Sequence, residues 1–378
     1  MEFLWEGLLQ ITWQQAVMYG IGILLIYLAV KKGYEPALLL PMGFGAILVN
    51  LPLSGVINQN VEGIGVVNGI IEWLFEVGIE ASEALPILLF IGIGAMIDFG
   101  PLLSMPSMFL FGAGAQFGIF FALSVAVLLG FDLKDAASIG IIGAADGPTS
   151  ILVSQILHSK YVGAIAVAAY SYMALVPIVQ PFAIRLVTTK KERCIRMEYT
   201  PGTVSKGMRI AFPILTTFLV GLVAPQSVAL VGFLMFGNLI RECGVLGTLS
   251  DTAQNVLANL ITLLLGLTIS FSMRAEAFVN VDTLLIMGIG LIAFVFDSIG
   301  GVLLAKFLNL FRKKKVNPMI GAAGISAFPM SARVVQKMAL EEDPGNIILM
   351  HAIGANVSGQ IASVIAGGLI IGLVSAYL

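Results

Sequence analysis

The residue that most clearly could do chemistry is Asp146, which lies in the apolar run 140–150. A carboxylate at membrane depth is costly, so its presence there indicates a functional role. Glycine and proline on either side interrupt a helix, and an interrupted helix presents backbone carbonyls to a buried site. Carboxylate, hydroxyl, amide and carbonyl oxygens bind hard monovalent cations in transport proteins. The run therefore predicts a sodium site built on Asp146.

A second set of polar residues interrupts the apolar sequence of the C-terminal half. It comprises Asn317, Ser326, Ser331 and Arg333, followed by Asn356, Ser358, Gln360 and Ser363. Arg333 is the one firm cation of this set, and a guanidinium group can receive an anionic carboxylate. It could instead reach the aqueous interface, or pair with the acids at 341–343.

Structural roles must be weighed beside these functional ones. Hydroxyl groups in membrane helices commonly bond to the backbone or to a neighbouring helix, and this is the interpretation we favour for Ser150, Ser358 and Ser363. Asp98, at the end of an apolar span, is also assigned a structural role. For Asp297, within an apolar span, a structural role and a place on an ion pathway remain equally open.

The elements that must position these residues are membrane helices. Of the 378 residues 58% are hydrophobic and 11% charged, and the mean hydropathy is +0.99, whereas soluble domains carry about 25% charged residues. No stretch is polar enough for a separate soluble domain, and the N-terminus lacks a basic signal region, so it is expected to be the first span. Two isolated cysteines and two isolated histidines support neither a disulfide framework nor a metal centre.

The apolar pattern predicts an all-α polytopic membrane protein with about ten transmembrane helices. The spans are expected at 12–30, 36–53, 84–103, 107–130, 161–187, 208–224, 226–241, 255–272, 283–311 and 347–376. Two more apolar segments, 137–157 and 316–336, contain glycine, proline and polar residues at their centres. We interpret them as broken, re-entrant segments.

Loop charges predict the orientation. Residues 185–209 contain seven basic residues against two acids, and the runs 312–315 and 31–32 are also basic, so all three are expected on the cytoplasmic side. The loop 54–83 contains five glutamates and no lysine or arginine, which fits the opposite side. Ten spans place every one of these loops on its expected side only if the two broken segments do not cross the membrane.

The two halves resemble each other in sequence. Residues 89–100 precede the run 143–150 at about the spacing at which 263–274 precede 324–331, and Pro148 then matches Pro329. Five spans per half would place the repeats in opposite orientations, as in ion-coupled transporters. The predicted organisation is a first inverted repeat at 1–187, a cytoplasmic basic loop at 188–207 and a second repeat at 208–378. A chance likeness of glycine-rich apolar segments remains the alternative.

Four runs carry a resemblance to a known family. They are residues 143–150 (GAADGPTS), 169–181 (AYSYMALVPIVQP), 317–334 (NPMIGAAGISAFPMSARV) and 350–359 (MHAIGANVSG). In this order, and across essentially the whole chain, the sequence resembles the beta subunit of the sodium-translocating biotin-dependent decarboxylases. That family includes the oxaloacetate, methylmalonyl-CoA, glutaconyl-CoA and malonate decarboxylase pumps.

The resemblance implies a subunit that decarboxylates carboxybiotin and couples this reaction to sodium export while consuming a proton. The family's sodium ligands fall on Asp146, Asn317, Gly321, Ser326 and Asn356. Its catalytic residues fall on Arg333, Ser326 and Tyr172, with Arg333 as the group that binds carboxybiotin. A hydroxyl near a bound cation could supply the proton that the biotin nitrogen needs, and Ser326 and Tyr172 are the candidates.

The implied partners follow from what this chain lacks. It contains no biotin-attachment motif and no carboxyltransferase domain, so a separate biotinyl carrier or carboxyltransferase subunit is expected, with a small gamma-type membrane subunit. Homo-oligomers in the inner cell membrane, contact with lipid and no nucleic-acid partner are also expected. The alternative function is a sodium-coupled secondary transporter or a cation–proton antiporter. A purely structural membrane anchor is disfavoured, because an anchor needs no polar groups at helix breaks.

Overall fold

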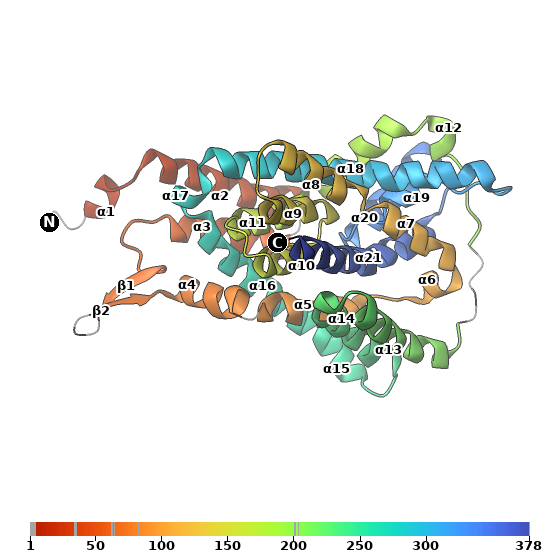
Figure 1. Cartoon of the computed structure of the whole chain (residues 1–378), viewed down its shortest axis with the longest axis horizontal. Coiled ribbons are helices and arrows are strands. Elements are labelled where there is room, and N and C mark those ends of the chain that lie inside the picture. Colours follow the sequence, from red (N-terminus) through yellow and green to blue (C-terminus); the bar gives the residue numbers. More distant parts are fainter. Residues whose placement is uncertain are drawn as a thin grey trace.

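The computed structural model describes residues 5–33, 36–61, 63, 65–81, 83–199, 202 and 204–377. Within these ranges the regular structure is helical, apart from one antiparallel hairpin formed by β1 (Asn58–Val61) and β2 (Gly65–Asn68). The predicted all-α class is confirmed (Figure 1).

The N-terminal half contains eleven α-helices within the described residues. They are α1 (Glu6–Leu9), α2 (Trp13–Lys32), α3 (Pro36–Val49), α4 (Ile70–Phe75), α5 (Ala84–Met96), α6 (Gly100–Ser104), α7 (Phe109–Gly114), α8 (Phe117–Leu128), α9 (Leu133–Gly140), α10 (Gly147–Ile156) and α11 (Val162–Val187). Short 3-10 or π turns extend several of them, among them η2 (Glu76–Glu80), η3 (Pro106–Met108) and η4 (Ile141–Ala144).

The second half follows after the short helix α12 (Lys190–Arg193). Its helices are α13 (Lys206–Val223), α14 (Val228–Glu242), α15 (Gly247–Asp251), α16 (Ala258–Ile269), α17 (Ala275–Phe278), α18 (Val281–Phe311), α19 (Met319–Ala322), α20 (Met330–Glu342) and α21 (Leu349–Ala376). The turns η5 (Pro225–Ser227), η6 (Thr252–Leu257) and η7 (Ser270–Met273) adjoin these helices.

Six described helical segments are long and apolar enough to cross a membrane, and two sharply bent pairs raise the number to eight. One bent pair is α11, whose two parts meet at 72°. Each of the ten predicted spans coincides with one or more helices, but 84–103 is divided between α5 and α6, and 107–130 between α7 and α8. The number of crossings therefore stays a prediction.

Both predicted breaks are present. In the first, η4 ends at Ala144, Ala145 adopts a left-handed conformation (φ 52°), and α10 starts at Gly147. In the second, α19 ends at Ala322 and α20 starts at Met330, with no regular helix between them. The two breaks meet, because the backbone N–H of Ser326 donates to the carbonyl of Ala144 at 3.0 Å.

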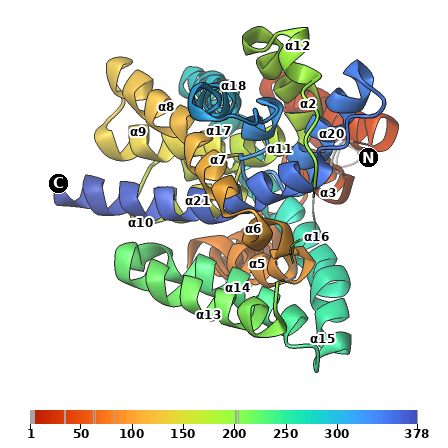
Figure 2. The same cartoon turned by 90° about the vertical axis from the view of Figure 1, so that its right-hand side faces the viewer.

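Two long helices enclose this meeting point. α21 packs so closely on the second break that a Cβ on Gly359 would lie 2.1 Å from the Gly324 carbonyl. On α18, a Cβ on Gly301 would lie 2.1 Å from the Gly321 carbonyl of α19. Glycine is the residue that permits such backbone contact. Figure 2 shows α21 between α18 and the pair α13–α14.

The hairpin of the 54–83 loop and the basic segments lie at opposite ends of the molecule. The β1–β2 hairpin lies at one end, while α12 and the C-terminal end of α18 lie at the other (Figure 1). Lys306 of α18 pairs with Glu192 of α12 at 3.0 Å, so the basic segments 185–209 and 312–315 belong to the same end. This arrangement agrees with the sidedness expected for those two segments. The inverted repeat remains a prediction.

Candidate functional site

Asp146 is the N-cap residue of α10. Its Oδ1 accepts the Thr149 backbone N–H at 3.3 Å, and its Oδ2 accepts the Thr149 hydroxyl at 2.7 Å. The side chain is buried, with 4% exposure. A capping carboxylate satisfies the free N–H groups of the first helical turn, and the positive end of the helix dipole stabilises its charge. The sequence Asp-Gly-Pro-Thr thus explains how a negative charge can persist at this depth.

A chain of hydroxyl groups joins Asp146 to the second break. Ser363 of α21 donates to Asp146 Oδ2 at 2.9 Å, and the hydroxyls of Ser363 and Ser326 lie 2.5 Å apart. Since Ser363 donates its proton to Asp146, Ser326 is the donor to Ser363. Ser326 Oγ also lies 3.2 Å from the Gly359 carbonyl. Both breaks and α21 therefore contribute oxygen atoms to one buried cluster.

α21 adds two amide side chains to this cluster. Asn356 Nδ2 donates to the Ile325 carbonyl at 2.7 Å, while its buried Oδ1 has no hydrogen-bond partner within the described residues. Gln360 donates to the carbonyl of Ser326. Asn356, Gln360 and Ser363 recur at helical spacing, so they form a polar stripe on one face of α21. The unpaired Asn356 oxygen is a further ligand of the kind that a cation requires.

The two tyrosines of α11 point to different places. The Tyr172 hydroxyl donates to the Met287 carbonyl of α18. The ring of Tyr170 lies against the first break, where a Cβ on Gly147 would come within 2.3 Å of it, and its buried hydroxyl has no hydrogen-bond partner within the described residues. Sequence reasoning chose Tyr172, yet Tyr170 is the tyrosine that contacts the Asp146 region.

Asn317 and Gly321 lie outside the hydroxyl cluster. Asn317 Nδ2 donates to the carbonyls of Arg193 and Ile195 at 2.8 and 2.9 Å, and its Oδ1 accepts the Met319 N–H at 3.1 Å. Gly321 provides the close contact of α19 with α18. These contacts give both residues a role in holding the second broken segment, and the structure does not bring either one to Asp146.

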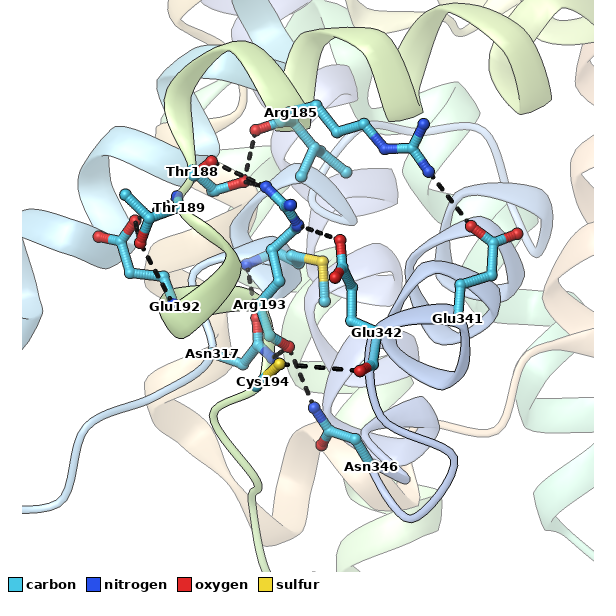
Figure 3. A network of polar contacts seen from close by, with 12 residues as sticks. Arg185, Thr188, Thr189, Glu192, Arg193, Cys194, Asn317, Glu341, Glu342 and Asn346 are labelled. Atoms are coloured by element: carbon cyan, nitrogen blue, oxygen red, sulfur yellow. Dashed lines mark hydrogen bonds and ion pairs between the residues drawn. The ribbon is translucent and has the colours of Figure 1, made fainter.

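Arg333 lies one turn into α20, and its side chain is exposed. It lines a surface cavity of about 420 Å³ together with Gln336, Lys337, Leu340, Glu341 and Leu349. The acids that it was expected to pair with bind other arginines. Figure 3 shows two of these ion pairs, Arg185–Glu341 at 3.2 Å and Arg193–Glu342 at 2.6 Å. The third is Arg196–Asp343 at 2.7 Å. Arg333 is therefore available to an anion from outside.

Asp343, which directly follows α20, has a lowered pKa. The hydrogen bond from Arg196 lowers the pKa of Asp343, and the backbone N–H of Gly345 lowers it further. Asn346, just beyond Asp343, donates to the same two carbonyls, of Arg193 and Ile195, that Asn317 binds. Both ends of the segment containing the second break are thus attached to one stretch of backbone (Figure 3).

Taken together, the buried cluster offers one carboxylate and three hydroxyls, from Thr149, Ser326 and Ser363. The unpaired oxygen of Asn356 lies about two helical turns before Ser363 on the same face of α21. Hydroxyls can both donate protons and offer lone pairs, so this set suits a hard cation. Sequence reasoning missed Ser363, which it assigned to structure. Its spacing of seven residues from Asn356 was the available signal. The structural assignments of Ser150 and Ser358 agree with their bonds to the carbonyls of Asp146 and Phe109.

Comparison with known proteins identifies the family. Residues 14–374 match the family described as Na+-transporting oxaloacetate decarboxylase beta subunit. The chain belongs to this family. It is 46% identical over 369 residues to the glutaconyl-CoA decarboxylase subunit beta of Acidaminococcus fermentans, covering 98% of this chain and 96% of that protein.

Two further relatives share almost the full length. The methylmalonyl-CoA decarboxylase subunit beta of Propionigenium modestum is 46% identical over 374 residues, covering 94% of each chain. The probable oxaloacetate decarboxylase beta chain of Vibrio cholerae is 42% identical over 419 residues, covering 97% and 96%. The chain is therefore the multi-pass membrane subunit of a sodium-pumping decarboxylase, and such beta subunits work within multi-subunit complexes.

Proposed function

We propose that this subunit decarboxylates carboxybiotin, presented by a separate biotinyl carrier, and uses the free energy to move sodium through the cluster around Asp146. The observation that carries the proposal is the hydroxyl chain Ser326–Ser363–Asp146, which links the two helix breaks at a buried position. A site at the junction of two discontinuous segments opens to either side when those segments move against their neighbours.

The proposed sodium ligands are oxygen atoms of Asp146, Ser326, Ser363 and Asn356, with Thr149 beside them. Asp146 supplies the charge, and the hydroxyl and amide oxygens complete the coordination. Asn317 and Gly321 are assigned instead to positioning, because the hydrogen bonds of Asn317 hold the chain before α19 and Gly321 allows α19 to approach α18. In this proposal, Asn317 and Gly321 match functional positions of the family because they hold the segment that contains Ser326.

Carboxybiotin is proposed to bind at Arg333. The volume of the cavity there is within the range of small-molecule sites. Lys337 adds a second positive charge, and the one acid in the lining, Glu341, pairs with Arg185. N-carboxybiotin is an anion, and loss of CO2 leaves a negative ureido nitrogen that must take a proton. We assign proton donation to Ser326, because the Tyr172 hydroxyl is bonded to α18. Sodium at Asp146 repels a proton held nearby, and this repulsion couples the two events.

The decisive experiment compares Asp146→Asn with Asp132→Asn in the assembled complex. Asp132 is an exposed acid just before α9, so its amide variant controls for the chemical change alone. Losing a buried charge that holds an ion costs about 3 kcal/mol or more, which corresponds to at least about 100-fold in sodium-stimulated turnover. Sodium-dependent decarboxylation that survives Asp146→Asn would refute the proposed site.

Avidin tests the biotin requirement separately. It should block sodium transport in native membranes if the ion pump depends on a biotinyl carrier, and leave a secondary transporter or antiporter unaffected. No feature of the site favours those alternatives over the family function. The carrier or carboxyltransferase subunit and a small gamma-type subunit are the proposed partners, in homo-oligomers in the inner cell membrane. Pull-down from that membrane identifies them.

A further inference from the structure

A second buried carboxylate lies near the first helix break, on α18. The Asp297 side chain is fully buried, with 0% exposure. Its Oδ1 accepts the backbone N–H of Ile119 at 3.2 Å, and its Oδ2 has no hydrogen-bond partner within the described residues. A Cβ on Gly143 of η4 would lie 2.8 Å from Oδ2, so the unpaired oxygen faces the segment that leads into Asp146.

Asp297 lies beside the broken segments that are proposed to move during transport. One turn further along α18, Gly301 contacts Gly321 of α19, so Asp297 lies between the contacts that α18 makes with the two broken segments. Ile119 is in the first turn of α8, directly after the interruption that separates α7 from α8. Asp297 therefore touches one broken segment and caps a second broken helix.

Two opposing influences act on this carboxyl group. Complete burial penalises the charged form, and an unpaired buried charge costs more than an unpaired neutral hydroxyl. The N-terminus of α8, a helix of twelve residues, favours the charged form through its N–H groups and dipole. A change in packing or hydration at the break is then enough to alter which form is favoured.

The contacts of the Asp297 carboxylate within the described residues are with backbone that carries no charge. Oδ1 lies against Gly118 and Ile119 of α8, and Oδ2 lies against Gly143 of η4. Tyr172 of α11 contacts α18 two turns earlier, near Gly290. In the described part of the chain, no lysine, arginine or histidine forms an ion pair with Asp297.

We propose that Asp297 is a proton-binding site that holds a proton on Oδ2 in this conformation and exchanges it with water as the broken segments move. On release the O–H bond breaks, the proton passes to water as hydronium, and the carboxylate remains facing the α8 N-terminus. On rebinding the reverse occurs. Asp297 would thus couple proton movement to the rearrangement that serves Asp146. The activity part of this inference rests on the proposed function.

The test uses the assembled complex with Asp297→Asn. The amide has the size of the acid and can still accept the Ile119 N–H, but it cannot ionise. Sodium-dependent decarboxylation is expected to fall at least tenfold and to lose one limb of its pH profile, while thermal unfolding stays unchanged. Asp135→Asn is the matched control, since Asp135 is also buried but pairs with Ser159 and Lys160. A wild-type rate and pH profile in Asp297→Asn would overturn the proposal.

An infrared measurement keeps the inference separate from the proposed function. Wild-type protein with ¹³C-labelled aspartate should show the carbonyl band of a protonated acid at neutral pH, and Asp146→Asn should retain that band. Its absence from both proteins would overturn the proposal, whether or not Asp297→Asn assembles. If the band is present but the wild-type complex shows no sodium-dependent decarboxylation, the proposed function fails while the proton site stands.

Discussion

Ser363→Ala is the most informative substitution, because this serine was not expected in the site. Its hydroxyl donates to Asp146 Oδ2 at 2.9 Å and lies 2.5 Å from the Ser326 hydroxyl. Alanine removes both interactions and breaks the hydroxyl chain at its centre. The Asp146 carboxylate keeps its two hydrogen bonds from Thr149.

The magnitude follows from the type of bond removed. A hydrogen bond to a charged group is worth about 1.5–3 kcal/mol, and every 1.4 kcal/mol changes an equilibrium constant tenfold. If the hydroxyl is also a sodium ligand, the loss falls directly on ion affinity. We therefore expect the sodium concentration for half-maximal decarboxylation to rise about 10- to 100-fold, with a smaller change in the maximal rate at saturating sodium.

The assay titrates sodium against decarboxylation rate in the reconstituted complex. Ser358→Ala provides the control on the same helix, since its buried hydroxyl bonds to the Phe109 carbonyl at 3.0 Å and lies outside the cluster. That variant should lose about 0.5–1.5 kcal/mol of stability and keep its sodium response. Equal sodium dependence in the wild type and Ser363→Ala would refute the assignment of this hydroxyl.

Two further outcomes test the packing and the charged network. Gly359→Ala places a Cβ 2.1 Å from the Gly324 carbonyl, so we expect it to lose more stability than the usual 1–3 kcal/mol for overpacking. Gel filtration should then show little assembled complex. The control Gly372→Ala has open space around its Cβ and should assemble normally. The depressed pKa of Asp343 means that its bond to Arg196 stabilises the fold above the unfolded-state pKa of about 3.9, and this contribution is lost as the pH falls through the lower folded value. The difference in unfolding temperature between wild type and Asp343→Asn should therefore be present at pH 7 and close towards pH 3; a constant difference would contradict this explanation.

The helix breaks could be predicted from sequence because their causes are local. Glycine and proline around Asp146 and Ser326 interrupt a helix wherever the rest of the chain lies. The contact between the breaks depends on packing over about 180 residues of sequence, and the sequence could indicate it only through the resemblance of the two halves. Ser363 was missed for the same reason. Its helical spacing from Asn356 and Gln360 shows that the three side chains share one face of α21, but not that this face meets Asp146.

The tyrosines of α11 show what could not be predicted from sequence even within one helix. Tyr170 and Tyr172 are two residues apart, so they point about 200° apart around the helix axis. Only one of them can face the first break, and an apolar helix with a bend gives no periodic signal to choose between them. The partners of Arg185, Arg193 and Arg196 were likewise hidden, because loop charges predict which side of the membrane a segment occupies and not which acid it binds.

The choice of hydroxyl groups around Asp146 has a chemical consequence for transport. A permanent cation such as lysine would neutralise the carboxylate and leave it no need of sodium. Backbone N–H groups could satisfy it too, but they cannot turn round to bind a cation. A serine or threonine hydroxyl does both, because it donates a proton to the carboxylate and, after rotating, offers a lone pair to the ion. In the proposed sodium site, Thr149 and Ser363 would therefore satisfy the same buried charge before and after the ion binds, which is what repeated binding and release across a membrane requires.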